Sequence, residues 1–340
     1  MTAEYFRYIL QFKRPGGTSR GVLHEKETFI LEISDQGKKG TGECAVFRGL
    51  SFDDRPDYEE KLQWLCKNIR QDPEFLKEEL KEFPSIWFGY EQAVLNLKNG
   101  SNLYFPSEFT KDKSPIIING LIWMGDVSYM EEQILDKLKK GFHCIKLKIG
   151  VDWKSEHKIL QELRRKFSKA QLELRVDANG GFTTEEAKTV LQQLADLHIH
   201  SIEQPIKAGN RKGMADLCAI TPTPIALDEE LIGITELDEK KKLLETIKPQ
   251  YVILKPSLIG GFSGSDEWIS LAEQQNVKWW ITSALESNIG LNAISQYTYT
   301  KNSIMPQGLG TGGLFTNNFE SQLDLKGDRL FFKNSNDRVE

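Results

Sequence analysis

The chain has 340 residues, more than one small domain needs and suited to a barrel of about 200 to 250 residues with an additional domain. Its hydrophobic share of 39% permits a large buried core, which argues against extended disorder. The formal net charge of -5 gives no electrostatic reason to expect nucleic acid or an anionic membrane as a partner.

The cysteines and the N-terminus indicate a cellular compartment. The four cysteines stand apart without a CxxC pair, which excludes a zinc-ligand spacing or a disulfide framework and favours reduced thiols. Residues 1–13 alternate aromatic, aliphatic and charged side chains and lack the apolar core of a signal peptide. No stretch approaches the roughly 20 apolar residues of a membrane span. We therefore expect a soluble cytoplasmic protein, and the sequence leaves its oligomeric state open.

The first 112 residues combine strand and helix patterns. Strand character is found at residues 5–12, 27–33 and 41–44, and a glycine-rich loop at 15–21 separates the first two strands. After Pro56 the apolar period becomes helical, which predicts helices at 58–69, from Pro73 onward, and at 85–97. This order predicts an α+β domain over residues 1–112.

Residues 113–312 show a different organisation, in which short apolar runs alternate with helices of about 10 to 15 residues. The runs are 116–118, 144–149, 172–176, 199–202, 224–227, 251–254, 277–281 and, more weakly, 303–305. Such alternation predicts a parallel sheet with crossover helices. Eight strands fit a closed barrel better than a doubly wound sheet, which would need a GxGxxG after its first strand. A hairpin signal at 325–330 predicts that the segment 313–340 packs back on the first domain.

Charged residues end five consecutive strands of this predicted barrel. In chain order they are Lys146 and Lys148, Asp177, Glu203, Asp228, and Lys255. Active-site groups of barrels come from the C-terminal ends of the strands. Strand alternation also places Lys146 with Lys148, and Arg175 with Asp177, on shared faces. Each residue alone could be a helix cap or a solvated side chain, but five successive strand ends argue jointly for a site.

The residue types suggest a chemistry. Three converging carboxylates repel one another unless a cation joins them, and oxygen-only ligands favour Mg²⁺, with Mn²⁺ as a substitute. Neighbouring lysines can hold a substrate carboxylate and reach its α-carbon. Burial beside other cations is expected to lower a lysine pKa and make it a usable base. The sequence therefore predicts proton abstraction from a small-molecule carboxylate.

The strand-end motifs resemble those of the enolase superfamily. They are KxK at 146–148, DAN at 177–179, EQP at 203–205, DE at 228–229 and LKP at 254–256. The lysine on the sixth predicted strand, Lys255, resembles the pattern of the muconate-lactonizing subgroup. The resemblance implies a modified TIM barrel, (β/α)7β, behind an N-terminal capping domain. It also implies Mg²⁺ on Asp177, Glu203 and Asp228, with Lys148 as the base and Lys255 on the opposite face of the enolate.

Further segments are similar to a dehydratase, a lyase of menaquinone biosynthesis. They are 42–51, where Phe47 and Arg48 depart from the usual Pro-Leu-Pro, 118–121, 283–287 and the glycine-rich 308–313. The resemblance implies a syn elimination in which Lys148 both removes the α-proton and protonates the departing hydroxyl. The substrate-binding candidates are Lys146, Arg175, Asn179, Ser283, Gly310 and Arg20.

Other functions remain open at this point. An N-acylamino acid racemase or a dipeptide epimerase would use Lys148 and Lys255 as opposed acid and base. Dipeptide epimerases commonly carry an Asp-x-Asp on the last strand, whereas residues 308–313 contain no acid. A muconate cycloisomerase is a further alternative. A non-catalytic scaffold is remote, because loss of activity usually removes the lysines or the metal ligands first.

Overall fold

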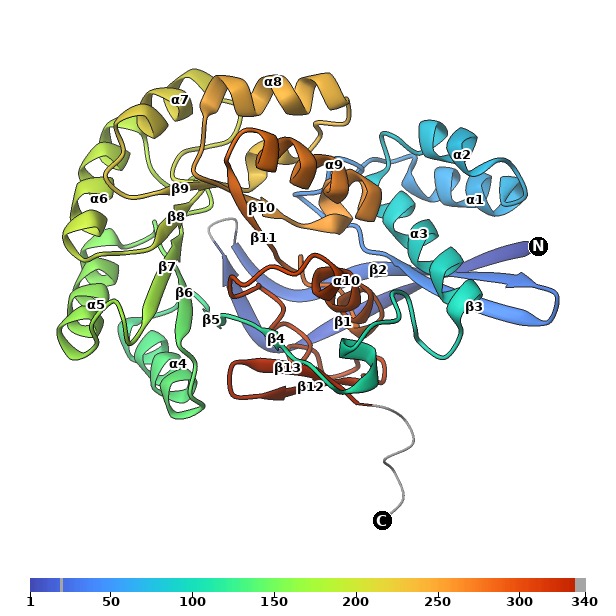
Figure 1. Cartoon of the computed structure of the whole chain (residues 1–340), viewed down its shortest axis with the longest axis horizontal. Coiled ribbons are helices and arrows are strands. Elements are labelled where there is room, and N and C mark those ends of the chain that lie inside the picture. The colour runs from blue at the N-terminus through green and yellow to red at the C-terminus, as the bar shows by residue number, and fades with distance from the viewer. Residues whose placement is uncertain (19–20, 334–340) are drawn as a thin grey trace, which may run out of the picture.

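The computed structural model describes residues 1–18 and 21–333, and the chain begins in it with an antiparallel meander (Figure 1). Its strands pair in the order β1 (Thr2–Thr18), β2 (Gly21–Asp35) and β3 (Lys38–Cys44). The first two strands are longer than predicted, because their pairing resumes at Gly16 after an irregularity that follows Gln11. Residues 16–18 of the predicted loop are therefore paired within this hairpin. Gly17 bridges to Met124 of the barrel, and a Cβ at Gly17 would lie 2.7 Å from the Met124 carbonyl oxygen.

Three helices cover this sheet, as the helical apolar spacing predicts. They are α1 (Tyr58–Asn68), α2 (Pro73–Glu79) and α3 (Pro84–Asn99). Asp72 caps α2 by accepting a hydrogen bond from the Glu74 backbone N–H at 2.9 Å. Helix α3 lies so close to β3 that a Cβ at Gly42 would collide with the Gly89 carbonyl oxygen. An apolar core that includes Phe29 and Leu62 fills the space between helices and sheet.

A curved parallel sheet of seven strands follows. In spatial order it runs from β11 (Lys278–Ile281) through β10 (Tyr251–Leu254), β9 (Ile225–Leu227), β8 (Ser201–Glu203), β7 (Glu173–Asp177) and β6 (Cys144–Lys148) to β5 (Gly120–Ile122). Gln307 bridges to Ile118 beside one edge, and Gly308 bridges to Thr282 beside the other. These two residues close the barrel, so the eighth strand predicted at 303–305 is wrong by a few residues.

Helices cover the outside of the barrel, and α4 to α8 form an arc around its strands in Figure 1. The helices are α4 (Val127–Lys139), α5 (Trp153–Lys166), α6 (Thr184–Asp196), α7 (Arg211–Ile220), α8 (Leu237–Ile247), α9 (Gly261–Gln274) and α10 (Asn288–Thr300). Single turns of 3-10 helix are η1 (Phe109–Lys111), η2 (Glu229–Leu231) and η3 (Pro256–Leu258). The strands are buried on both faces, which explains their continuous apolar runs. Among the described residues, no helix is long and apolar enough to span a membrane.

The C-terminal segment contacts both parts of the molecule. The predicted hairpin is present as β12 (Leu323–Lys326) and β13 (Arg329–Phe332). Its strand β13 pairs with β4 (Ile116–Ile117), the run predicted as the first barrel strand, and Phe332 also contacts the ring of Phe109, which lies within the predicted first domain. The preceding segment does reach β1, where Phe315 bridges to Phe12 and the Asn317 carbonyl accepts a 2.6 Å hydrogen bond from Tyr8. We propose the division into a capping domain at 1–112, a barrel at 113–312 and a C-terminal segment.

Candidate active site

The charged strand ends converge inside the mouth of the barrel. From β6, Lys146 Nζ donates hydrogen bonds to Glu203 Oε2 at 2.6 Å and to Asp177 Oδ2 at 3.2 Å. Lys148 Nζ, two residues further along β6, donates to the same Asp177 oxygen at 3.0 Å. The Asp177, Glu203 and Asp228 side chains are all buried. The structure thus places the predicted metal ligands and lysines in one cluster.

Two further contacts complete the cluster. Lys255 forms an ion pair with Asp228 and lies 3.8 Å from Glu203 Oε1. Asn179 Oδ1 accepts a 2.7 Å hydrogen bond from Lys148, and its Nδ2 donates to Glu229 Oε1 at 2.9 Å. Asn179 has a φ of 43°, a left-handed conformation that asparagine tolerates better than most residues. Its amide is occupied on both sides, so it positions Lys148 in this structure.

The neighbouring carboxylates act on the lysine pKa values. Burial works to lower the pKa of Lys146, but the Glu203 and Asp177 carboxylates outweigh burial and raise it. Burial and Asp228 oppose each other in the same way at Lys255, and the pKa of Lys255 is raised. The sequence predicts a lowered pKa for a lysine beside a bound metal ion, and that stays a prediction. A cation bound by the same carboxylates would weaken the rise of these two pKa values.

The carboxylates themselves respond in opposite directions. At Asp177 burial favours the neutral acid, but Lys148 and Lys146 outweigh it and hold the pKa of Asp177 below its usual value. At Asp228 burial dominates and raises the pKa well above its usual value, although Lys255 opposes this. Repulsion from neighbouring carboxylates adds to the rise at Asp228. One ammonium group therefore leaves the charge of Asp228 incompletely compensated.

The donor set fits a hard divalent cation. Among residues 1–18 and 21–333, no three acidic, histidine or cysteine groups have the arrangement of a metal site. In this structure the Lys146 ammonium group lies between Asp177 and Glu203. Nevertheless, three buried carboxylates from successive strands provide the oxygen ligands that Mg²⁺ prefers. Glu203 Oε1 is buried and has no hydrogen-bond partner among the described residues. Asp177, Glu203 and Asp228 would be the residues that hold such an ion.

A cavity of about 80 Å³ opens beside this cluster. Its charged side contains Lys146, Lys148, Asp177, Asn179 and Lys255. Its other side carries hydroxyl, amide and glycine residues together with apolar side chains, namely Phe47, Leu50, Asn119, Leu121, Trp123, Thr282, Ser283, Ala284, Leu285, Gly308, Gly310 and Thr311. Phe47 and Leu50 come from the capping domain. Both lie within segment 42–51, one of the segments that carry the family resemblance, although neither is among the predicted site residues.

The structure places the predicted substrate-binding residues in different surroundings. Ser283 and Gly310 line the cavity, and Ser283 Oγ donates to Glu286 Oε2 at 2.6 Å. Arg175 does not line it. Its side chain is 1% exposed, donates to Glu173 Oε1 at 2.7 Å and to the Pro306 carbonyl at 2.9 Å, and lies over the Trp280 ring. Arg175 is thus a buried structural residue, and the prediction for it is wrong. Arg20 lies outside the described residues.

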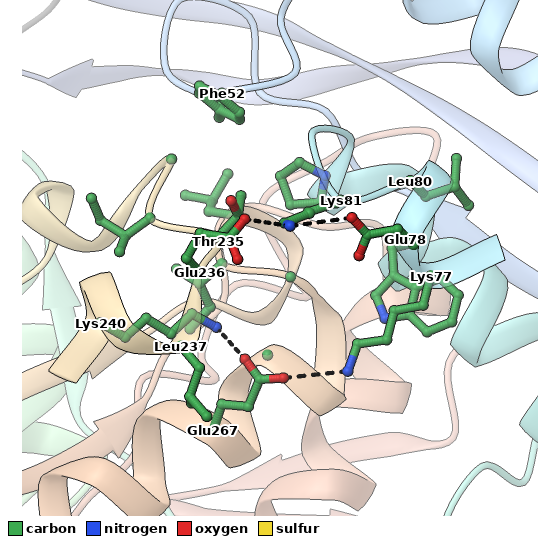
Figure 2. A pocket seen from close by; sticks show the side chains of 18 of the residues that line it. Phe52, Lys77, Glu78, Leu80, Lys81, Thr235, Glu236, Leu237, Lys240 and Glu267 are labelled. Atoms are coloured by element: carbon green, nitrogen blue, oxygen red, sulfur yellow. Dashed lines mark hydrogen bonds and ion pairs between the residues drawn. The ribbon is translucent and has the colours of Figure 1, made fainter. Parts of the chain in front are cut away.

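A second cavity, of about 290 Å³, lies between α2, α3 and the segments that precede α8 and α9 (Figure 2). Figure 2 shows Glu267 between Lys240 and Lys77, at 2.7 and 3.3 Å from their Nζ atoms. Lys81 similarly lies between Glu236 and Glu78. These charges compensate one another, and none of the charged strand ends reaches this cavity. The larger cavity is therefore a seam between the two domains, and we place the candidate active site in the smaller one.

Comparisons with known proteins agree with this architecture. Residues 129–322 match the family described as Enolase C-terminal domain-like. The o-succinylbenzoate synthase of Desulfotalea psychrophila is 43% identical over 97% of this chain and 98% of its own length. The chain belongs to the enolase C-terminal domain-like family. Membership of this family implies a divalent metal ion.

Solved structures of family members show the same fold. The crystal structure of MenC from Desulfotalea psychrophila superposes with a TM-score of 0.87 at 39% identity, and covers 97% of this chain and 99% of that one. The L-Ala-D/L-Glu epimerase of Bacillus subtilis superposes with a TM-score of 0.83 at 20% identity, and covers 98% and 96% of the two chains. The second likeness concerns the fold alone.

Proposed function

We propose that this protein is an o-succinylbenzoate synthase. This lyase uses Mg²⁺ to dehydrate 2-succinyl-6-hydroxy-2,4-cyclohexadiene-1-carboxylate to 2-succinylbenzoate, a step of menaquinone biosynthesis. The observation that carries the proposal is the 43% identity to an o-succinylbenzoate synthase along almost the whole chain. The strand-end cluster of lysines and carboxylates supplies the chemistry. The four free cysteines support the cytoplasmic location that we also propose.

The charges of the site suit this substrate. Three predicted metal carboxylates face three lysine ammonium groups, so their formal charges cancel. A divalent cation and a substrate with two carboxylates would enter together without a net change of charge. Such matching matters at a buried site, where uncompensated charge is costly. A bound Mg²⁺ would stabilise the negative charge that develops on the substrate carboxylate when the α-proton leaves.

The residues divide the work of the elimination. Lys148, after its resting ammonium group has released a proton to solvent, takes the α-proton, so the C–H bond breaks and its electron pair passes into the carboxylate-stabilised enolate. The electrons then return to form the new ring double bond as the C–OH bond breaks. The Lys148 ammonium group gives the same proton to the departing hydroxyl, which leaves as water from the same face. Asn179 positions Lys148 for both transfers through its 2.7 Å contact.

The other two lysines act through their charge. Lys255 lies beyond β10, across the barrel from Lys148, and would stabilise the enolate from its opposite face. Lys146 lies deeper on β6, where it would orient the substrate carboxylate and keep Glu203 and Asp177 apart. Neither residue exchanges a proton with the substrate in this proposal.

A racemase of N-succinylated amino acids is the second candidate. The observation that favours it is the placement of Lys148 and Lys255 on opposite sides of one cavity, which also suits removal of a proton from one face and its return to the other. The N-succinyl-L-Arg/Lys racemase of Bacillus cereus is 24% identical over 55% of this chain.

Proton NMR in D₂O separates the two candidates. Purified protein with Mg²⁺ is given the cyclohexadiene carboxylate and, separately, an N-succinylated amino acid. A synthase produces aromatic resonances from the first compound at a rate that far exceeds loss of the α-proton signal from the second. If the N-succinylated amino acid reacts faster, the protein is a racemase. The same two lysines would then act on a different substrate.

A further inference from the structure

One polar side chain of the candidate active site carries a buried oxygen that has no hydrogen-bond partner among the described residues. Asn119 lies directly before β5, lines the cavity, and is 3% exposed. Its backbone N–H donates a 2.9 Å hydrogen bond to the Gln307 carbonyl, which fixes it beside the segment that closes the barrel. Its Oδ1 is buried and has no hydrogen-bond partner among the described residues. Buried polar groups are nearly always paired, so an orphaned carboxamide in a cavity wall indicates a ligand contact.

The neighbouring polar groups on the same wall are already engaged within the protein. Ser283 donates to Glu286 and accepts a 2.8 Å hydrogen bond from Thr311. Thr282 Oγ1 donates to the Gly308 carbonyl at 3.5 Å. Among the described polar side chains of this wall, that of Asn119 therefore remains free to form a hydrogen bond with a ligand.

The position of Asn119 indicates which part of the substrate it contacts. The lysines and carboxylates occupy the ends of β6 to β10, where the reacting ring carboxylate is held. Asn119 directly precedes β5, which pairs with β6, so it lies at the border of this charged group, in the sector formed by β5, the closing segment and the end of β11. A Cβ at Gly310 would lie 3.7 Å from the Asn119 carbonyl oxygen, so this sector borders a bare glycine backbone. In the proposed function, the succinyl arm, which is bonded to the ring carbon next to the reacting carbon, would lie in this sector beside β6.

We propose that Asn119 is a specificity-determining residue that donates a hydrogen bond to the ketone of the succinyl arm. The inference rests on the proposed synthase function. A neutral carboxamide suits a neutral ketone better than a carboxylate, whose charge calls for cations or several N–H groups. Rotation of the Asn119 carboxamide by 180° exchanges its oxygen and its NH₂ group. The NH₂ group then takes the place of the buried Oδ1 and faces the cavity as a hydrogen-bond donor.

The test compares two product-like inhibitors with Mg²⁺ present. One is 2-succinylbenzoate, and the other is 2-(3-carboxypropyl)benzoate, in which a methylene replaces the ketone. Wild-type protein is expected to bind the ketone compound about 10- to 100-fold more tightly, the range of a paired against an unpaired buried polar group. In Asn119→Leu this preference is expected to vanish, whereas Thr311→Val, which removes an engaged hydroxyl from the same wall, keeps it.

Asn119→Asp gives a second readout in the same assay. Aspartate keeps the shape but cannot donate, so it loses the preference for the ketone if Asn119 donates. A preference that survives in Asn119→Asp or in Asn119→Leu overturns the assignment, as does equal loss of affinity for both inhibitors, which marks a structural role. Turnover of the cyclohexadiene carboxylate by wild-type protein is measured in parallel. Its absence overturns the synthase function and this inference together, whereas turnover with an unchanged preference overturns the inference alone.

Discussion

Replacement of Lys148 by alanine tests the proposed base. In the structure, Lys148 Nζ contacts Asp177 Oδ2 at 3.0 Å and Asn179 Oδ1 at 2.7 Å. After the substitution Asp177 still has Lys146 at 3.2 Å, so the buried carboxylate keeps a counter-ion. The substitution loses these two hydrogen bonds of the ammonium group, each worth roughly 1.5 to 3 kcal/mol of stability. Lys148→Ala is therefore expected to fold.

The substitution should also cause a large catalytic loss. A positioned general base contributes about 10²- to 10⁴-fold to the rate, and Lys148 would serve as base and then as acid. We expect kcat of Lys148→Ala to fall by at least about 10⁴-fold, which corresponds to roughly 5 kcal/mol of transition-state stabilisation. Stabilisation by Mg²⁺ in a thermal melt should persist, because the three carboxylates remain.

A matched control separates loss of the base from loss of a buried lysine. Lys240 is 2% exposed and pairs with Glu267 at 2.7 Å in the cavity remote from the strand ends. Lys240→Ala should lose stability but keep turnover, measured as formation of the aromatic product. Turnover of Lys148→Ala above a hundredth of the wild-type rate would refute the assignment of the base.

Three other predictions concern stability and are tested by urea denaturation. In metal-free Glu203→Gln, Lys146 loses the carboxylate 2.6 Å away but keeps Asp177 at 3.2 Å, so the free energy of unfolding should fall by about 1.5 to 3 kcal/mol; a fall below about 0.5 kcal/mol contradicts this. Burial raises the pKa of Asp53 to about 6, above its value of about 4 in the unfolded chain, so the native state retains this proton longer. The free energy of unfolding should then decrease by up to roughly 3 kcal/mol as pH rises from about 4 to about 6, and Asp53→Asn should lose that decrease; an unchanged pH dependence in the variant refutes it. Gly42→Ala places a Cβ against the Gly89 carbonyl and should cost about 1 to 3 kcal/mol, whereas Gly313→Ala, which meets no atom within 4 Å, should be nearly neutral; equal effects would contradict the packing argument.

The cluster of charged strand ends could be predicted because it follows from two simple periodicities. Buried parallel strands appear as apolar runs, and the residue after each run lies at the C-terminal edge of the sheet. The same reasoning failed where a strand is very short. Gln307 and Gly308 close the barrel with two residues and no apolar run, so the apolar pattern predicts the eighth strand at the neighbouring run 303–305 instead.

Depth along a strand could not be read from the sequence either. Arg175 shares a face with Asp177, as predicted, but two residues place it about 6 to 7 Å deeper in the barrel. There it binds the Pro306 carbonyl and not a ligand. The unpaired carboxamide of Asn119 depends on contacts between distant segments, and no sequence pattern reports such contacts. Likewise, the lysines could be predicted from the sequence, but not the short distances to carboxylates that raise the pKa of Lys146.

The most direct test of the account is an ultraviolet assay of purified protein with the succinyl-hydroxycyclohexadiene carboxylate while Mg²⁺ is titrated. The account predicts formation of 2-succinylbenzoate that saturates with Mg²⁺, stops on chelation and returns when the metal is restored. A folded protein that produces no aromatic product at any Mg²⁺ concentration would contradict the proposed function.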